Sequence, residues 1–129
     1  MEDKENTDEV HLARIDSTEF GKIVVDGKEY NEDIVISANG NVIYRQGISE
    51  SRYGTHHIVC KEEISSLLQD SPRVIVIGTG QYGACRLEKG VEEEAKKQDA
   101  KLIVERTPKA IHLFNNITDR KAGLFHLTC

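Results

Sequence analysis

A glycine-rich turn after an apolar run is the feature of this sequence closest to a known chemical motif. Residues 74–77 read Val-Ile-Val-Ile, and Gly78, Gly80 and Gly83 follow with the G-x-G-x-x-G spacing of dinucleotide-binding turns. In such turns the backbone approaches a pyrophosphate, which lies at the N-terminus of the next helix. Glu105 follows about 20 residues later, where an acid that binds ribose is expected.

The context of this turn decides between a nucleotide site and a structural turn. A dinucleotide site needs its third glycine at the start of a helix. The residues that follow allow either a helix from about Gly80, with Gly90 inside it, or a long loop and a helix from about Glu88. Because the chain also lacks room for a second mononucleotide-binding half, we interpret the glycines as a structural turn and expect no cofactor.

A small ligand or an anion at this turn is the alternative, because ligands of α/β proteins bind at the carboxyl ends of parallel strands. A cationic rim for an anion would come from Arg45, Arg52, Tyr53 and Arg73, and a solvated set of surface side chains is the favoured alternative. The candidate binding residues are Gly78, Thr79, Gly80, Gln81, Tyr82, Gly83, Arg52 and Tyr53.

Thiol and imidazole groups supply two further hypotheses. Cys85 follows the turn, and a thiol near a helix N-terminus has a lowered pKa, so Cys85 is the one candidate catalytic residue. A buried packing role is its alternative. His56, His57 and Cys60 suggest a metal site, but adjacent histidines in a strand point to opposite sides, so we expect no metal. Three cysteines without a close pair predict no disulfide framework.

Length and charge limit the class of protein. A chain of 129 residues predicts one domain, and a net charge of −5 without a basic stripe argues against nucleic acid as a partner. No apolar run approaches the ~20 residues of a membrane span, so we expect no membrane partner. Residues 1–10 are acidic and polar, unlike a secretory signal. We predict a cytoplasmic protein with a disordered tail at 1–10 and one domain at 11–129.

Apolar patterning predicts the elements that position these groups. Short runs at 23–25, 28–30, 34–37 and 42–44, separated by turn signals such as Asp26-Gly27 and Asn39-Gly40, predict an N-terminal antiparallel β-meander. Residues 45–59 are irregular and polar.

The second half of the chain predicts the order α-β-α-β-α-β around a central mixed sheet. A helix is expected at 61–69, and the uninterrupted apolar run at 74–77 predicts a central strand buried on both faces. The next helix is followed by a strand at 102–104. Thr107-Pro108 opens the last helix, with Thr107 as N-cap. A final strand at 123–128 is expected to have one buried face and one exposed face.

The order of these elements and several short motifs resemble the small Mth-domain family. This family includes the adipogenesis-associated Mth-domain protein and a mitochondrial complex I assembly factor. The residues that carry the resemblance are Ile77-Gly78-Thr79-Gly80, Glu105-x-Thr107-x-x-Ala110, Phe114-Asn115, Leu124 to Cys129 and the upstream Arg52-Tyr53-Gly54-Thr55. The resemblance implies an α/β domain of three layers, with helices on the faces of its sheet, and it favours the long loop before Glu88.

Two functions follow from these observations. The first is a non-catalytic module that binds a protein partner, as the assembly factor in the family suggests. The alternative is a protein that binds a small molecule, an anion or a nucleotide in a cleft at Gly78–Gly83, with an enzyme as one form of it. We favour the first, because the sequence has no convincing catalytic triad, metal cluster or pair of acids.

Overall fold

The computed structural model describes residues 11–129, so the predicted tail at 1–10 lies outside the described residues. Its strands form a central sheet of order β5-β4-β10-β7-β9, a second sheet of order β1-β2-β3 and a small pair, β6-β8. The strands are β1 (Ile15–Glu19), β2 (Lys22–Val25), β3 (Lys28–Tyr30), β4 (Ile34–Ile36), β5 (Val42–Tyr44), β6 (Ile58–Val59), β7 (Val74–Thr79), β8 (Arg86–Leu87), β9 (Lys101–Glu105) and β10 (Lys121–His126). The helices are α2 (Ile48–Tyr53), α3 (Lys61–Leu68), α4 (Val91–Lys97) and α5 (Thr107–Asn116).

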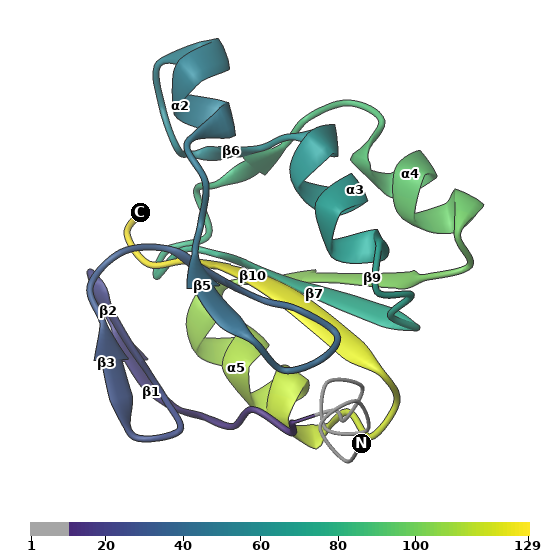
Figure 1. Ribbon diagram of the computed structural model, residues 1–129. Helices are drawn as coiled ribbons and strands as arrows, with labels where there is room; N and C mark the ends of the chain where they lie inside the picture. The colour runs from purple at the N-terminus through teal and green to yellow at the C-terminus, as the bar shows by residue number, and fades with distance from the viewer. Residues whose placement is uncertain (1–10) are drawn as a thin grey trace, which may run out of the picture.

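The central sheet is mixed and is covered on both faces. β7 pairs in parallel with β9 and β10, and β10 pairs antiparallel with β4. Every residue of β7 is buried, which confirms its predicted central place. Val74 and Val76 pack towards α5, whereas Ile75 and Ile77 pack towards α3 and α4 on the other face (Figure 1). The predicted α/β architecture of three layers is therefore confirmed.

The predicted meander is divided between two sheets. β2 and β3 form the expected hairpin, but β2 also pairs with β1, a strand that the sequence pattern does not predict. β4 and β5 instead join the central sheet through β10. The hairpin sheet packs on α5, and the side chain of Asn115 binds the backbone N–H and C=O of Ile15 at 2.9 and 2.8 Å.

Three local expectations are corrected by the structure. Residues 45–59 contain a short helix, α2, and the strand β6. The final strand, β10, is buried on both faces, because β4 and β7 flank it and helices cover it. The N-cap of α5 is Arg106, so Thr107 is the first helical residue and not the cap. The late start of α4 is confirmed, since that helix begins at Val91, but the expected loop before it contains the short strand β8.

The described helices are short. Within residues 11–129, none combines the length and the apolar character needed to cross a membrane.

The buried hydroxyl of Thr107 joins three segments. It donates to the carbonyl of His126 at 2.6 Å and accepts from the N–H of Gly80 at 2.9 Å. Thr107→Val would leave both backbone groups unpaired, so we expect the free energy of unfolding to fall by about 2–3 kcal/mol in urea denaturation. Thr118→Val, at an exposed threonine, should change it by less than about 0.5 kcal/mol. Equal effects of the two changes would contradict this role.

Candidate functional site

The glycine turn holds the chain's own residues 128 and 129. The N–H of Gln81 donates to the carbonyl of Thr128 at 3.0 Å, and the N–H of Ala84 donates to the carbonyl of Cys129 at 2.9 Å. A Cβ at Gly80, whose φ is +104°, would lie 2.2 Å from the Thr128 carbonyl oxygen. Glycine is therefore required here by the close approach of another backbone segment.

The N–H groups of Gly80 and Gly83 have partners too, and no helix starts at the end of the turn. The N–H of Gly80 is bonded to Thr107, and the N–H of Gly83 is bonded to the carbonyl of Gly80 at 3.3 Å. The hydroxyl of Thr79 donates to the backbone carbonyl of Glu105 at 3.2 Å. Because α4 begins only at Val91, the turn lacks the helix N-terminus that a pyrophosphate site uses.

Gln81 and Tyr82 face the hairpin sheet rather than a cleft. The amide of Gln81 donates to the hydroxyl of Thr18 at 3.1 Å. The ring of Tyr82 is 75% exposed and its centre lies 6.4 Å from that of Phe20, which is 60% exposed. The glycine turn and the turn between β1 and β2 thus present two aromatic rings side by side on the surface.

Arg52 and Tyr53, on α2, bind a different set of groups. Arg52 forms ion pairs with Glu62 at 2.7 Å and Glu88 at 2.9 Å. The N–H of Lys61 donates to Glu88 at 2.8 Å, and the hydroxyl of Tyr53 donates to the same carboxylate. These bonds lower the pKa of Glu88 to about 2, and the bond from the N–H of Lys61 has the largest effect. The polar groups of Arg52 and Tyr53 are thus used within this cluster.

Cys85 is a packing residue in the structure. It is 5% exposed in the core between the central sheet and the helices α3 and α4. Burial raises the pKa of its thiol to about 12, which is opposite to the lowering expected near a helix N-terminus. The expected lowering of the pKa is absent because α4 begins only at Val91, so Cys85 does not lie at its N-terminus.

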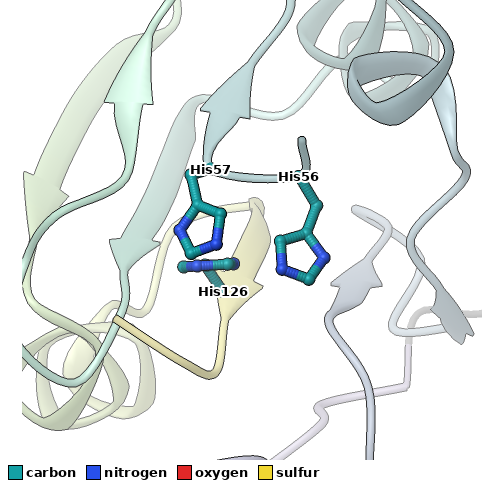
Figure 2. A group of neighbouring side chains, drawn as sticks. All are labelled: His56, His57 and His126. Carbon is teal, nitrogen blue, oxygen red and sulfur yellow. The ribbon is translucent and has the colours of Figure 1, made fainter. Parts of the chain in front are cut away.

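Three histidines that the sequence analysis did not combine meet at the end of β10. His126 comes from β10, and His56 and His57 come from the bend before β6 (Figure 2). Their ring centres lie 4.7 to 5.1 Å apart, and one nitrogen from each ring lies within 4.8 Å of the others. His126 is fully buried, whereas His56 is exposed. Cys60 is not part of this group and lies buried at the N-cap of α3, where its N–H donates to Glu63 at 2.8 Å.

A buried carboxylate orients His126. Asp33 accepts from Nδ1 of His126 at 2.7 Å, from the N–H of Leu127 at 2.9 Å and from Arg45 at 2.9 Å. Burial opposes its ionisation, but the bond and charge of His126 and the other donors outweigh burial, so the pKa of Asp33 is lowered. Nδ1 of His126 is therefore committed to Asp33, and Nε2 lies 3.3 Å from the hydroxyl of Thr128.

Arg45 supports both the carboxylate and the histidine bend. Its side chain is 3% exposed and uses all five N–H donors. Besides Asp33, it binds both carboxylate oxygens of Glu63 and the backbone carbonyls of His56 and Ile58, at 2.7 and 2.6 Å. The bend that carries His56 and His57 is thus held by the same guanidinium that binds the partner of His126.

The chain is thus a mixed α/β domain of three layers. Its glycine turn binds the backbone of residues 128 and 129, which follow the last strand. A family model described as "Protein of unknown function (DUF498/DUF598)" matches residues 15–124. The chain belongs to this family, which confirms the resemblance to Mth-domain proteins.

Solved structures of similar proteins support the same assignment. The conserved hypothetical protein PH1505 from Pyrococcus horikoshii OT3 is 31% identical, with a TM-score of 0.81 over 90% of this chain and 99% of that one. The protein MT938 is 32% identical, with a TM-score of 0.75 over 91% and 99%. A Mth938-like domain from Bordetella pertussis shares the fold at 14% identity, with a TM-score of 0.59 over 89% and 85%. No match was found among curated proteins.

The different burial of the three thiols predicts their reactivity. Cys60 and Cys85 are buried, and Cys129 is half-buried. In the native protein, iodoacetamide should label Cys129 first and Cys85 slowly, because only accessible thiolates react. Peptide mass spectrometry over time would measure each rate, and labelling in urea would show equal access. Native labelling of Cys85 as fast as that of Cys129 would restore Cys85 as a nucleophile.

The lowered pKa of Asp33 predicts a pH-dependent contribution to stability. Asp33→Asn should lower the free energy of unfolding by about 3 kcal/mol at neutral pH, because it breaks a buried ion pair. An unfolded aspartate ionises near pH 3.9, so the folded carboxylate stabilises the protein above that pH and loses this effect as pH falls through its lower folded pKa. The difference between wild type and variant should therefore shrink as the pH falls below about 3.9.

Asp26→Asn is the matched control, since Asp26 also accepts from a histidine and a backbone N–H but is exposed. Its effect on unfolding should stay below about 1 kcal/mol. If Asp33→Asn lowered the free energy of unfolding by the same amount at every pH, the ionised carboxylate would not be the source of that loss.

Proposed function

We propose that this chain is a non-catalytic protein-binding module of the cytoplasm, which holds its partner at an aromatic patch formed by Phe20 and Tyr82. The observation that carries the proposal is the exposure of two neighbouring aromatic rings, 60% and 75%. Tyrosine and phenylalanine are enriched in protein interfaces and supply much of their binding energy. Each ring can bury about 150–250 Å² on binding.

The backbone under the aromatic patch is fixed before any partner arrives. On the hairpin side, the N–H of Gly21 donates to the carbonyl of Leu127 at 3.0 Å. On the turn side, Gln81 binds Thr18 through its side chain and Thr128 through its backbone. A patch that needs little ordering on binding loses less entropy, so more of the contact energy becomes affinity.

The alternative, a small ligand at Gly78–Gly83, has less support. The backbone donors that would bind an anion at Gly80, Gln81 and Gly83 already have partners within the chain. An anion there would have to displace residues 128 and 129. The assembly factor in the Mth-domain family adds support for a protein partner.

A site-specific crosslinking experiment tests this proposal. Benzoylphenylalanine placed at position 20 or 82 in living cells should capture the same protein from both positions, in the cytosolic fraction. Position 12 is the matched control, because Leu12 is 75% exposed and apolar but lies outside the aromatic patch. Capture of one protein equally from all three positions, or of none from 20 and 82, would overturn the proposal.

The purified partner then allows a quantitative prediction. Phe20→Ala and Tyr82→Ala should each weaken its binding by about tenfold or more, as central interface aromatics do. Leu12→Ala should leave the dissociation constant unchanged. Because all three side chains are exposed, circular dichroism should show the same melting temperature for each variant. Unchanged binding in both aromatic variants would place the interface elsewhere.

A further inference from the structure

The imidazoles of His56, His57 and His126 form a cluster with the composition of a transition-metal site. Neutral imidazole nitrogens bind Zn²⁺, Ni²⁺ and Cu²⁺ well. One nitrogen from each ring lies within 4.8 Å of the other two, and Figure 2 shows the ring of His57 above that of His126 and the ring of His56 beside it. A tetrahedral zinc ion places two nitrogens about 3.3 Å apart, so a rotation of the exposed His56 side chain would close the set.

A sulfur atom lies near His57, and a change of its side-chain rotamer would be needed to bring it to all three imidazoles. The Sγ of Cys129 is 3.7 Å from Nε2 of His57. In tetrahedral zinc the corresponding nitrogen–sulfur distance is about 3.6 Å, from bond lengths of about 2.0 and 2.3 Å. Cys129 is therefore the candidate for a fourth ligand beside the three imidazoles.

The surrounding groups have the arrangement that orients metal ligands. In metal sites a ligating histidine usually donates its second N–H to a carboxylate, which fixes the tautomer. Asp33 accepts from Nδ1 of His126 in this way at 2.7 Å. The hydroxyl of Thr128 lies 3.3 Å from Nε2 of His126, and it can rotate to leave the nitrogen lone pair free.

Charge and access also suit a cation. Arg45 is the nearest fixed positive group to Asp33, but it is paired with Asp33 and Glu63, so the three groups together carry one negative charge. His56 is exposed, which leaves a path from solvent to the cluster.

We propose that His56, His57 and His126, with the Cys129 thiolate as fourth ligand, bind one divalent transition-metal ion such as Zn²⁺. This goes beyond the protein-binding function, which does not depend on it. It also reverses the expectation from the sequence that no metal is bound. That expectation assumed an extended strand, whereas His56 and His57 lie in a bend that brings their rings within 4.7 Å of each other.

Calorimetric titration of the metal-free full chain with ZnCl₂ tests the proposal. The wild type should bind one ion per chain, and MgCl₂ should give no heat, because Mg²⁺ prefers oxygen ligands. His56→Ala and His57→Ala should each weaken zinc binding by about tenfold or more, since each removes a ligand. His112→Ala, at an exposed histidine of α5, is the matched control and should bind as the wild type does.

Spectra separate the ligands and avoid the buried His126, whose removal would disturb the fold. Zinc should shift the imidazole ¹⁵N signals of the three histidines of the cluster but not that of His112. Cobalt(II) should give a thiolate charge-transfer band that is lost in Cys129→Ser. No zinc binding, or zinc binding that His56→Ala and His57→Ala leave unchanged, would overturn the site. Cobalt binding without the thiolate band would overturn the assignment of Cys129.

Discussion

The structure around β10 depends on one buried guanidinium. Arg45 follows the edge strand β5, yet its five donors reach Asp33, the α3 residue Glu63 and two carbonyls beside β6. A buried charge costs several kcal/mol unless every donor finds an acceptor, and here each one does. The segment that carries Arg45 and the three segments that supply its acceptors can therefore satisfy the guanidinium only in one relative arrangement. Through Asp33 that arrangement also extends to the residues at the end of β10.

The sequence predicts best the elements whose patterns report burial directly. The apolar run of β7 indicated a strand covered on both faces, and the spacing of Ile64, Leu67 and Leu68 located α3. β1 escaped prediction because only Ile15 of its five residues is buried, and the strand is fixed by Asn115 from another part of the chain. Local patterning carries no information about such a distant partner.

The candidate sites show the same limit at single residues. His126 interrupts an apolar run and was interpreted as the exposed face of a strand, but a carboxylate from before β4 allows it to be fully buried. Asp33 itself stands in an ordinary polar turn and gives no sequence signal. The spacing of the glycines is visible in the sequence, but the physical reason for a glycine at position 80 is not. Gly80 is needed because the backbone of residues 128 and 129 crosses it, which no spacing rule describes.

The place of β10 has a consequence for how the chain folds. This strand follows all the other described elements in sequence, yet it lies between β4 and β7 and pairs with both. Loop-closure entropy makes such distant pairings slow to form. During synthesis, β7 and β9 can pair early, but β4 and β5 have no place in that sheet until residues 121–126 have left the ribosome. Until then the apolar edges of β4 and β7 stay open, so this domain depends on its last strand for protection against aggregation.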